Sequence, residues 1–319
     1  MAKTIGVDLG GSHVLAAVVD EDGKIHHRSE FDITDRAPDV VIPLIAKAID
    51  DVLASSKDKA IDAVGVGAPG NVDLVTGAVR YSPNFGWHDV PLGARLRGHC
   101  GKNVIVGNDA RCAVLGEHTF GTGRGTANFV LLTLGTGIGG GIVAENTLLL
   151  GNAGGAGEFG HSQIRATDGF VCSCGKTGCF EAQASGTGLV RHALALAPSF
   201  PRSELSNVKP EKLGSREIRK AAEAGDAHGL AAWTRFIDDL ARGLANVIAF
   251  SNPQTIALGG GVASAGDFML AAVRPRVEEL TTMVPRGQTS IVTAALGNDA
   301  GAIGAATMAR RGGLTTKDR

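Results

Sequence analysis

Residues 4–19 read TIGVDLGGSHVLAAVV, and this stretch decides the fold of the chain. Thr4–Leu9 is a short run of β-forming residues, and Gly10-Gly11-Ser12 follows it directly. A dinucleotide-binding unit would open a helix after such glycines. Here a second apolar run follows, Val14–Val19, and then Glu21-Asp22-Gly23, which is a hairpin turn signal. The glycines therefore join two antiparallel strands, and a third strand is expected after the turn.

The same pattern returns later in the chain. Phe129–Leu134 is an apolar run, residues 135–141 (GTGIGGG) form a glycine-rich stretch that we interpret as a loop, and residues 142–144 begin another strand. Strand, glycine turn, strand, tight turn, strand thus occurs twice, about one domain length apart. Residues without side chains let backbone N–H groups approach phosphate oxygens, and the Thr136 hydroxyl adds a donor. The two turns therefore predict a polyphosphate ligand that is held from both sides.

Three of the five cysteines fall within eight residues, Cys172, Cys174 and Cys179, and His161 lies eleven residues upstream. One nitrogen and three sulfurs are the ligands of a closed tetrahedral zinc site, whereas an iron–sulfur cluster usually needs four cysteines. Glu158 and Glu181 flank this set and are not needed to complete it. We therefore expect a structural zinc, in a loop that also presents polar groups to a substrate.

Two aspartates follow predicted strands. Asp8 lies beside the first glycine turn, where it suits a Mg²⁺ ion near phosphates, although Asp-Leu-Gly-Gly is also an ordinary turn. Asp109 stands between a strand and a helix. It suits the general base that takes a proton from an attacking hydroxyl, and equally the N-cap of the helix that follows.

The remaining elements are assigned from apolar periodicity. Gly259-Gly260-Gly261, after a buried strand, could receive a nucleoside or form a plain strand-to-helix turn. The closing helix, residues 299–310, is rich in small residues, which predicts close packing. Helices are also expected at residues 39–53, 110–117, 215–224 and 231–250, and strands at 61–67, 104–106, 148–150, 255–258 and 291–295.

Length and composition limit the classes of function. A chain of 319 residues suggests two domains, which we place at residues 1–118 plus 299–319 and at residues 119–298. A net charge of −1 gives no electrostatic reason to expect nucleic acid or an anionic membrane as a partner. No apolar run is long enough to cross a bilayer, and the first residues have no signal-peptide layout, so a cytoplasmic location is expected.

With these residues in view, the chain resembles bacterial glucokinases of the ROK family (repressors, open reading frames, kinases). The resemblance runs nearly end to end, from GVDLGG at residues 6–11 to GNDAG at residues 297–301. Its most specific part is GEFGH at residues 157–161 together with CSCGKTGCFE at residues 172–181.

The resemblance implies an α/β, actin/hexokinase-like (ribonuclease H-like) fold with two domains and a deep interdomain cleft. It implies phosphorylation of a hexose by ATP with Mg²⁺, with glucose accepting at its 6-hydroxyl, and a homodimer or homotetramer. It implies that Asp109 is the catalytic base and that zinc is bound by His161, Cys172, Cys174 and Cys179. The implied sugar contacts are Gly70, Asn71, Asn84, Asn108, Asp109, Glu158, His161 and Glu181. The implied ATP and magnesium contacts are Asp8, Gly10, Gly11, Ser12, Gly135, Thr136, Gly137, Gly139, Gly260 and Gly261.

Two positions depart from the pattern of the family. Ser12 stands where the phosphate turn usually ends in threonine, and it keeps the hydroxyl. Arg111 stands where another asparagine is common, which changes the local charge.

Three alternatives remain open at this point. The acceptor could be another sugar, such as N-acetylmannosamine, fructose or allose, and the donor could be polyphosphate. The family also contains sugar-responsive transcriptional repressors with an N-terminal helix-turn-helix. We expect an enzyme, because the glycine turn begins at Gly10 and the chain is not basic.

Overall fold

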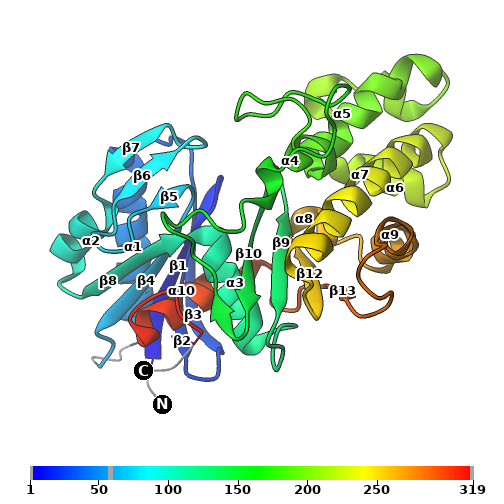
Figure 1. The fold of residues 1–319 in the computed structure, drawn as a ribbon. Helices are drawn as coiled ribbons and strands as arrows, with labels where there is room; N and C mark the ends of the chain where they lie inside the picture. The colour runs from blue at the N-terminus through cyan, green and yellow to red at the C-terminus, as the bar shows by residue number, and fades with distance from the viewer. Residues whose placement is uncertain (1–2, 57–59, 317–319) are drawn as a thin grey trace. The chain divides into compact units, whose positions relative to one another are not determined.

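The computed structural model describes residues 3–56 and 60–316, and Figure 1 traces its helices and strands. Packing divides the chain into two compact units. The first unit comprises Met1–Ala127, Gly141–Ala156 and Ala295–Arg319, and the second comprises Asn128–Gly140 and Gly157–Ala294.

The first unit contains a five-stranded mixed sheet with the order β3-β2-β1-β4-β8. β1 and β2 are antiparallel, with Leu9 opposite Val14, so the glycines between them form a hairpin turn as predicted. β1, β4 and β8 run parallel to one another. The strands are β1 (Lys3–Leu9), β2 (His13–Asp20), β3 (Ile25–Asp32), β4 (Ala63–Ala68) and β8 (Asn103–Asn108).

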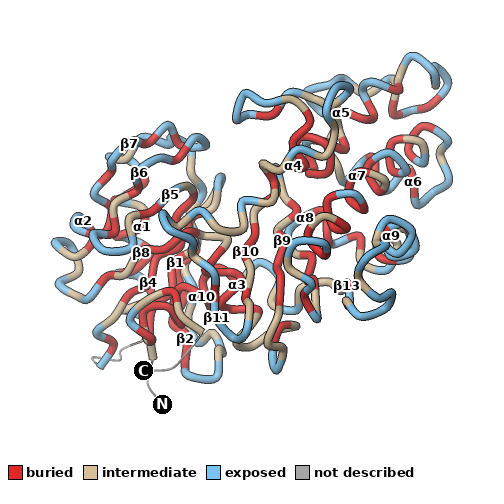
Figure 2. Tube along the Cα trace, in the orientation of Figure 1, coloured by how far each residue is buried: buried red, intermediate tan, exposed pale blue. Residues whose placement is uncertain are grey.

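Both faces of this sheet are covered by helices. In β2, Val14, Ala16 and Val18 join a core that includes residues of helices α1 (Pro38–Ser56) and α2 (Leu92–Cys100). The alternate residues of the same strand, Leu15, Ala17 and Val19, pack against Ala302, Ile303 and Ala306 of α10 (Ala300–Arg311). Figure 2 shows the result as buried chain along β1, β4 and α10.

Helix α10 lies directly against the backbone of its neighbours. A Cβ atom at Gly6 of β1 would lie 1.8 Å from the carbonyl oxygen of Ala302, and one at Gly65 of β4 would lie 1.8 Å from that of Ala305. A Cβ at Gly304 would lie 1.7 Å from the carbonyl oxygen of Cys112 in α3 (Asp109–Phe120). Atoms this close would overlap, so these positions require glycine. The close packing predicted from the small residues of this helix is confirmed.

A second, smaller sheet of the first unit was not predicted. Its order is β5-β6-β7, with β5 (Asn71–Val72), β6 (Val79–Ser82) and β7 (Trp87–Val90). Strands of two to four residues are too short to show an alternating pattern. Phe85 and Trp87 belong to the core below α1, which anchors the turn between β6 and β7.

The other five-stranded sheet of the chain repeats the strand order of the five-stranded sheet described above. It runs β11-β10-β9-β12-β13, and β9, β12 and β13 are parallel. The repeat predicted from the sequence is therefore present in the topology. The strands are β9 (Phe129–Leu134), β10 (Ile138–Ala144), β11 (Thr147–Leu148), β12 (Thr255–Gly259) and β13 (Ser290–Thr293). The chain passes from the second unit to the first within β10, between Gly140 and Gly141.

The prediction that residues 135–141 form a loop is only partly right. Only residues 135–137 form the turn, and β10 starts at Ile138. A Cβ at Gly140 would lie 2.5 Å from the carbonyl oxygen of Leu131, so this glycine permits close packing within the sheet. Glycine density by itself therefore overestimated the length of the loop.

The helices of the second unit pack around one long helix, α7 (Ala227–Ser251). Both predicted helices of this unit are present, and α4, α5 and α9 were missed. The remaining elements are α4 (Phe180–Ala184), α5 (Gly186–Leu196), α6 (Ser215–Glu223), α8 (Gly260–Ala263), α9 (Asp267–Leu280) and the 3-10 helices η1 (Phe159–His161), η2 (Ala197–Ser199), η3 (Glu204–Asn207) and η4 (Pro210–Lys212), with η5 (Gly297–Asp299) in the first unit.

The packing units do not share the bounds that we predicted for the domains, at residues 118 and 298. Residues 141–156 pack with the first unit, and its last segment begins at Ala295. The predicted domains stay a prediction, and their residues 1–2, 57–59 and 317–319 lie outside the described part of the chain. Within residues 3–56 and 60–316, no helix has both the length and the apolar character needed to cross a membrane.

Gly304→Ala should destabilise the protein by about 3 kcal/mol or more, because its Cβ has no room beside Cys112. Gly98→Ala is the matched control. Gly98 is exposed in α2 with open space around it, so alanine should raise the free energy of unfolding by about 0.5–1 kcal/mol. Urea unfolding of both variants measures the two effects. Equal stability of the two variants would contradict the packing described for α10.

Candidate active site and metal centre

Asp8 is the last residue but one of β1, close to the first glycine turn. A Cβ at Gly301 would lie 2.5 Å from the Asp8 carboxyl carbon, so this glycine at the start of α10 makes room for the carboxyl group. Burial of that group, and next the negative charge of Asp109, raise the pKa of Asp8 to about 7. A buried carboxyl group with a raised pKa beside a second carboxylate is a favourable place for a cation.

The N-cap of α3 is Asn108 rather than Asp109. The Asn108 side-chain oxygen accepts a hydrogen bond from the Arg111 amide at 3.1 Å, and its nitrogen donates to the Gly70 carbonyl at 3.0 Å. Asp109 is the first residue inside α3, and its side chain accepts from the adjacent Ala110 amide at 2.8 Å. The alternative in which Asp109 is merely the cap of its helix is therefore wrong.

Asp8, Asp109 and Cys112 share one environment in the first unit. The pKa of the buried Cys112 thiol is raised by desolvation and then by the charges of Asp8 and Asp109. Gly67 permits this approach, because a Cβ there would lie 3.2 Å from the Asp109 Cα. Both carboxylates thus stand at the carboxyl ends of parallel strands, where α/β proteins commonly bind ligands.

The first glycine turn is closed by its own backbone. The Gly10 amide donates to the His13 carbonyl at 3.0 Å, so in this state the cradle predicted here depends on the amides of Gly11 and Ser12. Gly11 and Ser12 are exposed. The structure thereby modifies the prediction for Gly10, whose amide has a partner within the turn.

The predicted sugar contacts of the first unit lie on the small sheet and its connections. Gly70 precedes β5 with a φ of +103°, and a Cβ there would lie 2.2 Å from the Tyr81 carbonyl oxygen. Asn71 begins β5, and its side chain donates to the Ala153 carbonyl at 3.1 Å. Asn84 is exposed in the turn between β6 and β7.

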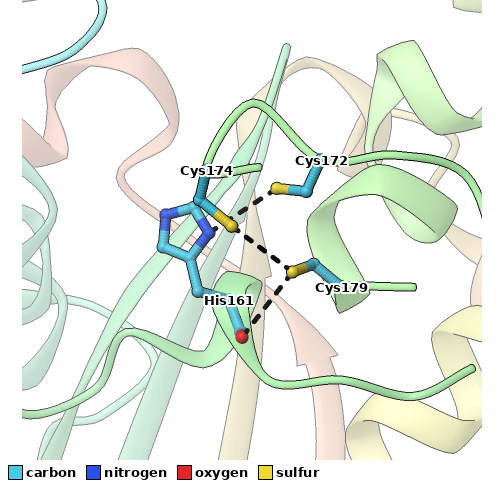
Figure 3. A group of neighbouring side chains, drawn as sticks. All are labelled: His161, Cys172, Cys174 and Cys179. Carbon is cyan, nitrogen blue, oxygen red and sulfur yellow. Dashed lines mark hydrogen bonds between the residues drawn. The ribbon is translucent and has the colours of Figure 1, made fainter. Parts of the chain in front are cut away.

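In the second unit, His161, Cys172, Cys174 and Cys179 come together (Figure 3), with their ligand atoms within 4.8 Å of one another. The Cys174 and Cys179 sulfurs are 3.6 Å apart, and the Cys172 sulfur is 3.7 Å from His161 Nδ1. Tetrahedral zinc, with Zn–S of about 2.3 Å and Zn–N of about 2.0–2.1 Å, would separate two sulfurs by about 3.8 Å and sulfur from nitrogen by about 3.6 Å. The four residues fit zinc.

The cysteine loop has the tight turns that such a site needs. Gly175 and Gly178 have φ values of +87° and +79°, and a Cβ at Gly178 would lie 1.6 Å from the Arg165 carbonyl oxygen. Arg165 in turn donates from Nε to the buried Asp239 of α7 at 2.7 Å. The loop is therefore tied to the main helix of its unit.

Without a cation, the Cys179 thiol resists ionisation in its buried place beside the other two sulfurs. Burial, followed by hydrogen bonds and charge from Cys174 and Cys172, raises the pKa of Cys179. The Lys176 amide, by contrast, lowers the pKa of Cys174 to about 7. A divalent cation at the centre would stabilise all three thiolates together.

Glu181 connects this loop to the second glycine turn. Its Oε2 accepts from the Ile138 amide at 2.9 Å, and a Cβ at Gly137 would lie 2.2 Å from the same oxygen. Its Oε1 accepts from the Ser173 hydroxyl at 3.4 Å and lies 3.8 Å from the Cys172 sulfur. Glu181 stays a predicted sugar contact, and one of its oxygens also holds the second glycine turn.

The second glycine turn has neighbours that sequence analysis did not identify. The Thr187 hydroxyl donates to the Thr136 carbonyl at 2.9 Å, and the Gly186 amide donates to the Gly135 carbonyl at 2.8 Å. Both donors begin α5, and the sequence Ser185-Gly186-Thr187-Gly188, with Ser185 as N-cap, is the signal that could have identified this helix start.

The other predicted nucleotide contacts lie in α8 and in β10. Gly260 begins α8 with a φ of +84°, and a Cβ there would lie 2.6 Å from the carbonyl oxygen of Leu134, which ends β9. Gly261 follows in the same short helix, so the strand-to-helix turn is the observed conformation. Gly139 lies in β10 and not in the turn. Glu158 is exposed immediately before η1, the 3-10 turn that carries His161.

The comparisons with known proteins agree with this geometry. A model of the ROK family matches residues 4–312. The chain belongs to the ROK family. A glucokinase from Thermotoga maritima is 39% identical over 310 residues, covering 96% of each chain. A crystal structure of a ROK-family glucokinase from Streptomyces griseus in complex with glucose and AMPPNP has a TM-score of 0.84 and 35% identity, covering 97% of this chain and 99% of that one.

The chain is also similar in structure to a regulator of the ROK family. A ROK-family transcriptional regulator, a homologue of the E. coli MLC protein, has a TM-score of 0.84 and 26% identity, with 95% of this chain and 76% of that one covered. The ROK fold, an actin-like sugar-kinase fold, is thus shared by enzymes and regulators, and both the predicted family and the predicted fold class are confirmed.

We expect the purified ROK protein to contain about one zinc per chain, and Cys172→Ser to lose it, because the closed site needs all four ligands. Inductively coupled plasma mass spectrometry measures the metal. Cys100→Ser is the matched control, since Cys100 lies on α2 and should leave the zinc content unchanged. Protein purified without zinc, or a Cys172→Ser variant that retains it, would contradict the assignment.

A pKa of about 7 for folded Asp8 has a consequence for stability. The folded state keeps a proton that the unfolded chain loses near pH 4, so this contribution to stability is lost as pH rises towards 7. In Mg²⁺-free buffer, the free energy of unfolding of the wild type should fall between pH 5 and pH 8 by about 2–3 kcal/mol more than that of Asp8→Asn. Urea unfolding at both pH values measures this, and parallel pH profiles would refute the raised pKa.

Proposed function

We propose that this ROK-family protein is a glucokinase, which transfers the terminal phosphoryl group of ATP to the 6-hydroxyl of glucose. The observation that carries the proposal is the similarity over nearly the whole chain to glucokinases, one of them solved with glucose and a nucleotide. The site supports it, because two acidic side chains and two glycine turns are the groups that phosphoryl transfer to a hydroxyl requires.

Asp109 is the proposed general base. Its carboxyl group is not used as the N-cap of α3, because Asn108 has that role. A carboxylate can accept the proton of a sugar hydroxyl as the hydroxyl attacks phosphorus. Asp8 is the proposed partner of Mg²⁺, which neutralises phosphate charge when bound. The raised pKa of Asp8 supports this role, since a cation would favour its ionised form.

The proposed contacts to the substrates follow the sequence analysis. The amides of Gly11 and Ser12, and of the turn at Gly135, Thr136 and Gly137, would stabilise charge on phosphate oxygens. Gly10, Gly139, Gly260 and Gly261 are the other proposed contacts to ATP. Sugar hydroxyls are proposed to meet Gly70, Asn71, Asn84 and Asn108 in the first unit. In the second unit they are proposed to meet Glu158, His161 and Glu181.

Zinc is proposed as a structural ion. His161 and the three cysteines would fill all four positions of its tetrahedron. Phosphoryl transfer needs no further Lewis acid beside Mg²⁺. What the ion supplies is a fixed loop. When bound, it would hold His161 in place together with Cys172, which lies beside the Glu181 oxygen. A homodimer or homotetramer in the cytoplasm is proposed from the habit of the family.

A coupled assay of ADP release over a panel of sugars tests the function. With MgATP, glucose should give the highest kcat/KM among glucose, N-acetylmannosamine, fructose and allose. Asp109→Asn should lower kcat by at least about 10³-fold, because the base is lost, while calorimetry should find glucose affinity within about threefold of the wild type.

Asp39→Asn is the matched control, because Asp39 is an exposed carboxylate in the first turn of α1 and should leave turnover unchanged. A different preferred sugar would make the protein a ROK kinase for that sugar. Near-normal turnover by Asp109→Asn would remove Asp109 as the base. An absence of ATP-dependent turnover with every sugar would refute the proposed function.

A further inference from the structure

One arginine of the first unit contacts both the phosphate turn and the turn that carries Asn84. Arg36 lies between β3 and α1. Its Nη2 donates to the Gly11 carbonyl at 3.1 Å, and its Nη1 donates to the Asn84 carbonyl at 2.8 Å. The guanidinium therefore bridges a proposed phosphate-binding segment and a proposed sugar-binding residue.

The backbone around Arg36 holds the same two segments. On the phosphate side, the Ile33 amide donates to the Ser12 carbonyl at 2.8 Å. On the sugar side, the indole nitrogen of the buried Trp87 donates to the Arg36 carbonyl at 2.7 Å. Segment 33–36 thus makes two hydrogen bonds to residues 11–12 and two to residues 84–87. The contacts of Arg36 are therefore part of a connection between these two segments.

The sugar-side contact also involves aromatic packing. The Arg36 guanidinium carbon lies 5.7 Å from the centre of the Phe85 ring, and Phe85 packs edge-on against Trp87 at 5.0 Å. Phe85 is buried, so it is a fixed platform for the cation. The guanidinium therefore contacts both the Asn84 carbonyl and the ring of the residue that follows it.

The chemistry of the guanidinium suits this bridge. It is planar, always charged and has donors that diverge at fixed angles, so two carbonyl oxygens can be held at a set separation. A lysine ammonium is a point charge and cannot set that geometry. Arg36 is exposed, and exposed contacts of this kind add little to the stability of a fold. A role in arranging the two turns explains the contacts better than a role in the core.

We propose that Arg36 is a positioning residue that sets the phosphate turn and the Asn84 turn in one arrangement before substrates bind. This inference rests on the proposed function and deepens it. With the bridge in place, neither substrate has to order the turn that it meets, and a nucleotide that orders one turn also orders the other. Arg36 thereby couples the binding of the two substrates.

Arg36→Ala tests the proposal, with Arg95→Ala as the matched control. Arg95 is a surface arginine of the same unit that pairs with Asp39 on α1. Arg36→Ala should raise KM for glucose and for MgATP by about tenfold each and lower kcat by less than about threefold. Calorimetry should show that AMPPNP tightens glucose binding in the wild type and in Arg95→Ala, and that this tightening is lost in Arg36→Ala.

Arg36→Lys separates positioning from charge. Because lysine keeps the charge and lacks the divergent donors, it should restore less than half of the lost affinity on a logarithmic scale. Full restoration by lysine would overturn the bridging role in favour of charge alone. A loss of kcat with unchanged KM would overturn it in favour of a direct contact with the reacting phosphoryl group. Unchanged constants and unchanged coupling in Arg36→Ala would overturn it outright.

The same experiment keeps the two proposals apart. Should the wild type prefer another sugar of the panel, the glucose assignment fails, and the comparison of Arg36→Ala with Arg95→Ala is made with that sugar. Should the wild type phosphorylate no sugar, both proposals fail. The midpoint of urea unfolding is measured for each variant. If Arg36→Ala has a lowered midpoint, Arg36→Gln, which is shorter and uncharged but keeps a polar side chain, is assayed for the same KM and coupling changes.

Discussion

The contact between helix α10 and its neighbours is the constraint on which the first unit depends. Backbone meets backbone at Gly6, Gly65 and Gly304, so the helix, two central strands and α3 have essentially one way to fit together. That fit places Gly301 under the Asp8 carboxyl group. It also sets the position of α3 along α10, and the first residue of α3 is Asp109. The raised pKa of Asp8 is thus a product of packing that begins several residues away, in glycines that carry no chemistry of their own.

The second unit has a comparable constraint in its metal ligands. Four side chains that could hold a metal converge there, and burial beside two other sulfurs raises the pKa of Cys179. A bound cation would favour its thiolate instead. Glu181 extends the effect, because it touches the cysteine loop with one oxygen and the Ile138 amide with the other. The metal loop and the second glycine turn are therefore one connected structure. A substrate group that met Glu181 would meet a side chain already oriented from both ends.

The two sheets share one strand order, and the repeated hairpin that begins each of them was visible in the sequence. The family and the fold class followed from motifs of high specificity, GEFGH and the cysteine run, because those residue types at those spacings have few other uses. Two helices of ordinary length, α5 and α9, were missed, and so were several short elements. Strands β5–β7 and helix α4 are two to five residues long, too short for a period to be recognised, and glycine density exaggerated the second loop because three of its glycines pack inside or beside a strand.

The sequence by itself determined the hairpins that form the two glycine turns and the four side chains that could hold a metal, and it suggested the residues that we propose to carry the chemistry. Those features are local, and residue type and spacing along the chain specify them. Only the tertiary structure decided that Asn108 and not Asp109 caps α3, that Glu181 holds the second turn, and that Arg36 reaches both Gly11 and Asn84. Each of these depends on a hydrogen bond whose direction is set by side-chain conformation, and two of them join segments more than forty residues apart in sequence, whose proximity no local pattern encodes.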